Sequence, residues 1–201
     1  MADYRDKMDR KELFEKEDYL SPEEGYPERS ISNWFLPIIL PNVLDNVISN
    51  KNILDVGCSF GYCSREFSKH FTNVLGVDLA QNRIDYAKKY ETKKLNFLQI
   101  DLSKTPLIQY TGSYQFDNVY TSAVIQHIPL EGKPFAIRNI ASVTKTGGKL
   151  LMFDHREKEE IRDDFVGSYN ENYFINNFPE WKFLSVEFIV GDTWFYQFEK
   201  V

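Results

Sequence analysis

The chain has few cysteines, no long apolar run and no excess of positive charge, and each shortage argues against a class of protein. Its 201 residues include two cysteines, Cys58 and Cys63. Their spacing, without a nearby histidine cluster, does not fit a zinc site. Small buried thiols are therefore expected rather than a disulfide, which fits a reducing compartment such as the cytoplasm.

Long hydrophobic stretches are also missing. The most apolar N-terminal run, Trp34 to Leu40, is too short to span a bilayer and contains Pro37. The charged start, Met1 to Lys7, has no signal-peptide core. The sequence therefore predicts a cytoplasmic protein without a membrane partner.

Positive charge is the third shortage. The chain carries 24 Lys and Arg against 30 Asp and Glu, which gives a net charge of -6. This balance argues against broad binding to nucleic acids or anionic membranes, although it does not exclude a small basic patch. No nucleic-acid partner is expected.

The most informative stretch that is present runs from Ile53 to Phe67. It begins as an apolar run ending in Asp55, passes through a small-residue turn with Gly57 and Gly61, and then becomes helical in character. Glycine allows backbone angles and close ligand approach that a side chain would obstruct. The pattern predicts a buried strand, a tight loop and a helix start, where open α/β sheets bind ligands.

The same loop is a poor phosphate site. It lacks the Gly-Lys-Ser/Thr ending of a nucleoside triphosphate loop and the third glycine of a dinucleotide fingerprint. The carboxylate of Asp55 would repel a pyrophosphate and attract a cation. A ligand with an ammonium group and a nucleoside therefore fits better than NAD.

Two further acids end the next two predicted strands. Asp78 ends the segment from Asn73, and Asp101 follows the segment from Leu95 to Ile100. An acid after the second strand can accept hydrogen bonds from both ribose hydroxyls. Helix capping or turn formation is the alternative for both acids. Three acids at three successive strand ends favour a ligand site.

With these motifs the chain resembles the class I S-adenosylmethionine-dependent methyltransferases. The resemblance covers roughly residues 51–154, plus a compatible C-terminal tail. Ser59 departs from the pattern, because the family often has its middle glycine there. The motifs are Asp55-Val-Gly-Cys-Ser-Phe-Gly61, Gly76-Val-Asp78, Gln99-Ile-Asp101-Leu102 and Phe116-Asp117-Asn-Val-Tyr-Thr-Ser122.

The resemblance implies an α/β fold with a Rossmann-like, doubly wound, seven-stranded sheet, mostly parallel with an antiparallel C-terminal strand and helices on both faces. Residues 1–50 are expected to form an N-terminal helical arm or lid, and residues 51–201 a single class I methyltransferase domain. Pro37 and Pro41 are expected to break the last helix of the arm into pieces.

Further elements follow from local patterns. Residues 102–113 are expected to form a loop. Thr146-Gly147-Gly148 is expected to stop the helix predicted at 134–143. Helices are expected at 63–70, 80–90, 134–143 and 170–178, and strands at 116–121, 149–153, 181–190 and 193–199.

For the cofactor, S-adenosylmethionine, the resemblance implies contacts at the strand ends. Asp55 and the glycine-loop backbone would hold the methionine part, Asp78 the ribose, and Asp101 with the Leu102 backbone the adenine. Ser122 would lie beside the amino-acid part. The full expected set is Asp55, Gly57, Cys58, Ser59, Gly61, Asp78, Leu79, Asp101, Leu102 and Ser122.

Two histidines are candidate general bases, because imidazole titrates near neutral pH. His127 follows the fourth predicted strand, in a segment where the resembled family commonly has a histidine, and His155 follows the fifth. A structural hydrogen bond is the alternative for each. No metal is predicted, although Asp154, His155 and Asp164 could form a site, as some oxygen-methylating relatives use magnesium.

The main functional hypothesis is methyl transfer to a small molecule, with a hydroxyl of a sugar or another hydroxylated metabolite as the preferred acceptor. Methylation of an amine or protein nitrogen is an alternative, since an acidic enzyme also suits cationic acceptors. A non-catalytic, cofactor-binding regulatory subunit and a nicotinamide dehydrogenase are further alternatives. Exposed aromatic residues in the tail could serve a homodimer.

Overall fold

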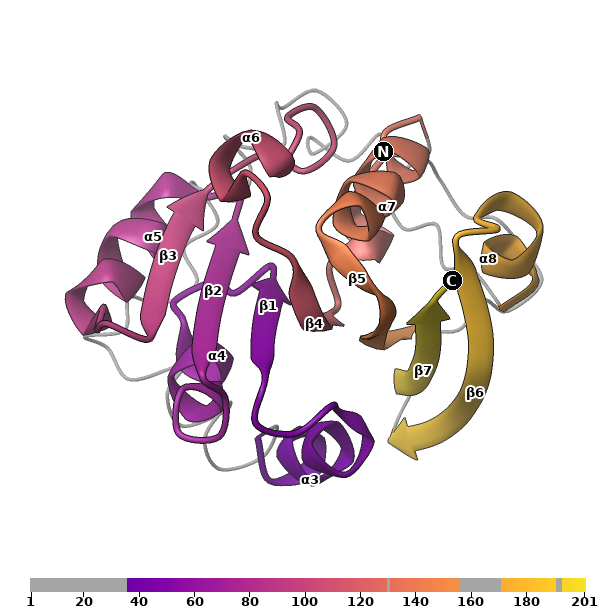
Figure 1. Cartoon of the computed structure of the whole chain (residues 1–201), viewed down its shortest axis with the longest axis horizontal. Helices are drawn as coiled ribbons and strands as arrows, with labels where there is room; N and C mark the ends of the chain where they lie inside the picture. Colours follow the sequence, from indigo (N-terminus) through magenta and orange to yellow (C-terminus); the bar gives the residue numbers. More distant parts are fainter. Residues whose placement is uncertain (1–35, 130, 156–170, 191–192) are drawn as a thin grey trace, which may run out of the picture.

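A seven-stranded sheet forms the centre of the structure, a computed structural model that describes residues 36–129, 131–155, 171–190 and 193–201 (Figure 1). The strand order is β3-β2-β1-β4-β5-β7-β6. The strands are β1 (Asn52–Val56), β2 (Asn73–Asp78), β3 (Leu95–Gln99), β4 (Phe116–Ser122), β5 (Thr144–His155), β6 (Trp181–Val190) and β7 (Thr193–Lys200).

The pairing directions confirm the architecture expected from the sequence. Strands β1 to β5 pair in parallel. Strand β7 lies between β5 and β6 and is antiparallel to both, which leaves β6 at one edge of the sheet. The chain moves outward from β1 to β3 and then returns to β4 on the other side of β1. Open α/β sheets bind ligands at the carboxyl ends of strands at such a reversal.

Helices cover both faces of this sheet. Neighbouring residues of β4 show the division, because Val119 belongs to one buried cluster and Tyr120 to the other. Helices α3, α4 and α5 contribute to the Tyr120 cluster, and α7 and α8 to the Val119 cluster. The helices are α3 (Leu36–Asn46), α4 (Tyr62–Phe67), α5 (Gln81–Ala87), η4 (Lys88–Tyr90), α6 (Ile108–Thr111), η5 (Ile125–His127), α7 (Lys133–Ser142) and α8 (Glu171–Asn177).

Helix α3 corrects one prediction, because it runs without a break through both Pro37 and Pro41. Pro37 lies in the first turn, where a backbone N–H has no helical acceptor. Pro41 removes one internal hydrogen bond, and the burial of Ile39 and Val43 against the sheet offsets that loss. Of the arm or lid predicted over residues 1–50, residues 1–35 lie outside the described residues.

Several boundaries also differ from the prediction. Thr146-Gly147-Gly148 does not stop a helix but lies inside β5, and α7 ends earlier, at Ser142. The register between β4 and β5 shifts here, and Gly147 has a φ of 78° that suits the irregular strand. Residues 102–113 contain the single-turn helix α6. No helix in the described ranges is long and apolar enough to cross a membrane.

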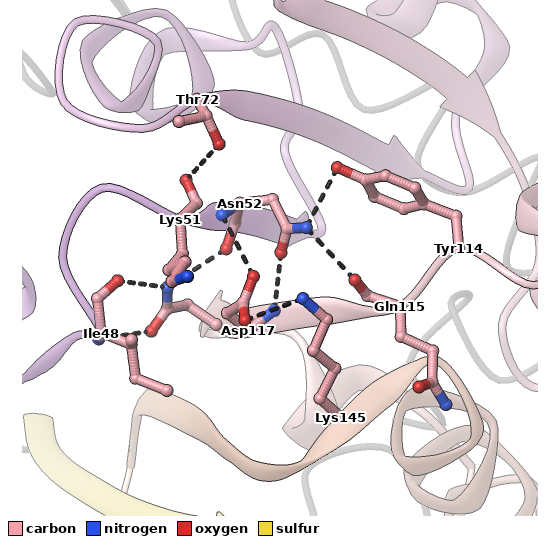
Figure 2. A network of polar contacts seen from close by, with 9 residues as sticks. Ile48, Lys51, Asn52, Thr72, Tyr114, Gln115, Asp117 and Lys145 are labelled. Carbon is pink, nitrogen blue, oxygen red and sulfur yellow. Dashed lines mark hydrogen bonds and ion pairs between the residues drawn. The ribbon is translucent and has the colours of Figure 1, made fainter.

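A buried polar network ties the segment after α3 to the amino-terminal ends of β1 and β4 (Figure 2). Asn118, with no exposed surface, accepts from Ile48 N at 2.8 Å and donates to Ile48 O at 3.0 Å and Asn52 O at 3.1 Å. Asp117 N donates to Asn52 Oδ1 at 2.6 Å, and Lys145 Nζ lies 2.9 Å from Asp117 Oδ1. This network lies at the strand ends opposite to the acids at 55, 78 and 101.

Replacing Asn118 by alanine is expected to lower the free energy of unfolding by about 2–4 kcal/mol, because it removes the partners of the partly buried backbone N–H and C=O of Ile48 and of the buried C=O of Asn52. Urea unfolding would measure the loss. The matched control is Asn96→Ala, at an exposed position of β3, which should change stability by less than about 0.5 kcal/mol. Equal losses in the two variants would contradict the role given to the network.

Candidate functional site

A cavity of about 350 Å³ opens at the carboxyl ends of β1, β2, β3 and β4. Most of the residues proposed from the sequence share it, although they come from four different strand ends. Its lining includes Gly57, Ser59, Asp78, Leu79, Asp101, Leu102, Ser122 and His127. The volume suits one ligand of nucleoside size.

Other proposed residues lie outside the lining of this cavity. Asp55, Cys58 and Gly61 belong to the same glycine loop but do not line it. Cys58 and Cys63 are free thiols; Cys58 is buried, as predicted, whereas Cys63 is only partly buried, and burial raises the pKa of both. His155 pairs through its backbone with Thr193 at the end of β5, and its side chain lies outside the described part of the chain.

The glycine loop owes its shape to three residues with left-handed backbone angles. Gly57, Ser59 and Gly61 have φ values of 74°, 51° and 78°. A side chain at position 57 would collide with Val124, which follows β4. Ser59 shows why glycine suits this position, because an L-residue in this conformation costs about 1–2 kcal/mol.

Asp78 holds the loop and still has acceptor capacity for a ligand. Its Oδ2 accepts from Ser59 N and its Oδ1 from Ala80 N, both at 2.9 Å. A carboxylate oxygen has about two lone-pair sites, so each oxygen keeps one. Two adjacent acceptors match two adjacent ribose hydroxyls. Turn formation and ligand binding, which were alternatives from the sequence, are therefore compatible in one side chain.

Asp101 has a similar double character. Its Oδ1 accepts from Ser103 N at 3.0 Å and from Ser103 Oγ at 2.6 Å, which forms the turn after β3. Its Oδ2 lies 3.4 Å from Lys104 Nζ. The lysine side chain is mostly exposed, so this ion pair contributes little to stability. All three residues line the cavity.

Asp55 faces helix α4 rather than the cavity. It is 1% exposed, and Ser64 Oγ donates to its Oδ2 at 2.5 Å. Burial raises the pKa of Asp55 to about 7, and the nearby charge of Asp78 also raises it. Any influence of Asp55 on a ligand would therefore be indirect, because its printed hydrogen bond is to Ser64 in α4.

His127 stands at the edge of the cavity on the short helix η5. Its backbone N donates to Val124 O at 2.9 Å, and Ile125, two residues earlier, is buried in the core. The imidazole is partly exposed and lines the cavity. Its Nε2 lies 3.3 Å from Nε2 of Gln126.

Several lining residues were missed in the sequence. Arg83 lies in α5, just after Asp78, and its position in that helix was the available signal. Ala123 was not missed, because it ends the strand expected to face the methyl group, but its φ of 52° has no signal in the sequence. The others are Val56, Val77, Ile100, Ser103, Lys104, Val124, Ile128 and Pro129.

No metal centre is evident in the part of the chain that the structure describes. Within those ranges no group of three His, Cys, Asp or Glu side chains is placed to hold an ion. The set considered from the sequence includes Asp164, which lies outside the described residues.

Comparisons with known proteins agree with this geometry. Residues 53–148 match a family described as "Methyltransferase domain". The chain is 31% identical over 107 residues to the ubiquinone biosynthesis O-methyltransferase of Coxiella burnetii, covering 52% of this chain and 43% of that protein. It is 29% identical over 123 residues to a tRNA N(3)-methylcytidine methyltransferase of Schizosaccharomyces pombe, covering 58% of this chain and 49% of that protein. The chain thus spans less than half of the length of either relative.

Solved structures share the fold. The DhpI–SAM–HEP complex superposes with a TM-score of 0.67 at 15% identity, over 84% of this chain and 87% of that one. The family match and this cofactor-bound structural neighbour together identify the kind of domain that carries the cavity. Residues 53–148 thus form a methyltransferase domain of the class I type, and the cofactor of this domain is S-adenosylmethionine.

Proposed function

We propose that the protein transfers the methyl group of S-adenosylmethionine to a hydroxyl oxygen of a small molecule, a sugar or another hydroxylated metabolite. The observation that carries this proposal is the position of His127, a candidate proton acceptor, in the same cavity as Asp78 and Asp101. The printed name of the Coxiella relative, an O-methyltransferase, supports an oxygen acceptor.

The described residues fit this cofactor. Asp78 would hold the ribose with its two remaining acceptor sites, and Asp101 with the Leu102 backbone would contact the adenine. The bare backbone at Gly57 would allow close approach of the methionine part. The cofactor supplies a methyl group already activated on a sulfonium, so the protein mainly has to align the acceptor.

His127 would act on the acceptor rather than on the cofactor. As the acceptor oxygen bonds to the methyl carbon, the carbon–sulfur bond breaks and its electron pair stays on sulfur. The hydroxyl proton passes to the imidazole of His127. The product pair is the methyl ether and S-adenosylhomocysteine.

The test is release of S-adenosylhomocysteine from protein, S-adenosylmethionine and pooled acceptors. The pools are sugars, nucleotide sugars, phenols, amines, peptides and tRNA. Turnover with hydroxylated small molecules alone is the expected result. His127→Gln should then lower kcat by about 100-fold or more, with unchanged affinity for S-adenosylhomocysteine. The control is His70→Gln, at an exposed position after α4.

Other outcomes would redirect the proposal. The Schizosaccharomyces relative is named for methylation of a nitrogen in tRNA, so turnover with tRNA or amines alone would overturn the oxygen acceptor. The net charge of -6 makes a polyanionic acceptor the less favoured case. Cofactor binding without turnover on any pool would favour the non-catalytic regulatory alternative.

A further inference from the structure

A row of aromatic rings lies on the outer side of α5, η4 and the glycine loop. The ring centroid of Tyr86 is 5.6 Å from that of Phe60 and 5.7 Å from that of Tyr90. The hydroxyl oxygens of Tyr86 and Tyr90 are 3.2 Å apart. All three side chains are at least partly exposed, so the row belongs to the surface and not to the core.

A cation accompanies each of these rings. The guanidinium carbon of Arg65, in α4, is 4.2 Å from the ring centroid of Tyr90. Lys89 Nζ is 4.7 Å from the centroid of Tyr86, and the guanidinium carbon of Arg83 is 5.8 Å from the centroid of the next ring. Such contacts hold the cations in place beside the rings. We call this set the cation–aromatic surface: Phe60, Arg65, Arg83, Tyr86, Lys89 and Tyr90.

The chain around this surface is locally basic. Residues 83–94 include five basic residues and two acids, although the whole chain has a net charge of -6. Both acids already accept hydrogen bonds, Asp85 from Gln81 Nε2 at 2.7 Å and Glu91 from Phe97 N at 3.0 Å. The four lysines of this stretch are exposed and have no carboxylate partner among the described residues. The described residues therefore do not compensate the positive charge of these lysines.

The opposite charge is concentrated in one segment of the same chain. Residues 12–28 contain seven acids and one lysine, which gives this acidic segment a net charge of -6. The segment lies outside the described residues. It also has five large apolar or aromatic side chains that suit contact with aromatic rings: Leu13, Phe14, Tyr19, Leu20 and Tyr26.

The acidic segment is close enough in sequence to reach the cation–aromatic surface. The described chain begins at Leu36 with α3, and the helices on this face of the sheet follow one another in the order α3, α4, α5 (Figure 1). The eight residues from Glu28 to Leu36 span up to about 26–29 Å when extended. Packed neighbouring helices are about 8–10 Å apart, so this length covers the distance from α3 to α5.

We propose that the acidic segment docks on the cation–aromatic surface of its own chain. Its carboxylates would face Lys89 and the neighbouring lysines, and its apolar side chains would pack on the tyrosine rings. A tethered segment has an effective concentration in the millimolar range, which favours it over an untethered polyanion. Because Arg83 also lines the cavity, the docked segment would lie beside the cofactor site. This interaction depends neither on the acceptor nor on the role of His127.

The first test is crosslinking of the full chain with a carbodiimide, which joins a lysine amine directly to a carboxylate in contact with it. Mass spectrometry of the peptides is expected to find acids of residues 12–28 joined to lysines of residues 88–94. The ion pair between Lys149 and Glu199 is the internal positive control. A mixture of ¹⁴N and ¹⁵N protein distinguishes links within one chain from links between two chains.

The second test reverses the charge of the surface. Lys88→Glu combined with Lys89→Glu should lower the protection of residues 12–28 against amide hydrogen exchange by about fivefold or more, because two attractions become repulsions. Adding Glu23→Lys and Glu24→Lys should restore the protection. The matched control, Lys182→Glu with Lys200→Glu, makes the same charge change on β6 and β7, far from β3 in the sheet, and should leave the protection unchanged. A thermal melt confirms that each variant is folded.

Docking within one chain would be overturned if the Lys149–Glu199 link formed and no link joined residues 12–28 to residues 88–94. Links found only between ¹⁴N and ¹⁵N chains would replace it by contact with a second copy. Binding of a single-stranded RNA oligomer at these lysines, without links to the acidic segment, would replace it by a nucleic-acid partner. An equal loss of protection in the surface variant and the control would also overturn it, because the effect would then be one of net charge alone.

Discussion

Asp78→Ala is expected to weaken binding of S-adenosylhomocysteine by at least about 100-fold. Two charge-assisted hydrogen bonds to the ribose are worth about 1.5–3 kcal/mol each, and the substitution removes both. It also removes the acceptors of Ser59 N and Ala80 N, so the loop loses its anchor as well. Isothermal titration calorimetry would measure the change in dissociation constant.

Two further variants separate the loss of affinity caused by the missing ribose contacts from the loss caused by a disturbed loop. Asp78→Asn keeps one acceptor oxygen and should give a smaller loss than alanine does. Asp85→Ala removes a carboxylate from an exposed position of α5 and should leave affinity unchanged. Wild-type affinity in a folded Asp78→Ala protein would refute the ribose assignment.

The second large effect concerns pH and Asp55. A folded-state pKa of about 7, raised by burial from the ordinary aspartate value, means that the folded protein holds a proton that the unfolded chain has already released. The contribution of this proton to stability is fully present below about pH 4. It is lost as the pH rises to about 7 and stays lost above that. In the cofactor-free protein this loss amounts to about 4 kcal/mol at most.

Asp55→Asn imitates the protonated carboxyl and retains an acceptor for Ser64 Oγ. We therefore expect the variant to exceed wild type in unfolding free energy by about 2–4 kcal/mol at pH 8 and by little at pH 4. Denaturant unfolding across this range would measure the difference, with Asp85→Asn as the exposed control. A difference that does not vary with pH would show that Asp55 ionises normally in the folded protein.

The sequence predicted the architecture and the meeting of Gly57, Asp78 and Asp101 at one edge of the sheet. It could do so because apolar runs ending in acids encode both the strands and their carboxyl ends. It could not place the side chain of Asp55, because that depends on Ser64, which the fold brings close from the next helix.

Other differences also arose from tertiary contacts. Prolines predict a broken helix locally, whereas burial of one face of α3 against the sheet offsets the missing hydrogen bond. Gly147 and Gly148 read as a helix stop, whereas the shifted register of β4 and β5 uses them inside a strand. The contact between the side chains of Gln126 and His127 could not be predicted either, because adjacency in the sequence does not say whether two side chains touch.

The position of β7 between β5 and β6 has a consequence for biosynthesis. Strand β6 is made first, yet its pairing partner in the sheet is β7, which also pairs with β5. During translation the β6 segment therefore remains an unpaired, partly apolar strand until Thr193–Lys200 have left the ribosome. An unpaired strand of this kind is open to association with other chains. Completion of this sheet is thus a late step, and a nascent chain stalled before β7 would be a natural client for chaperones.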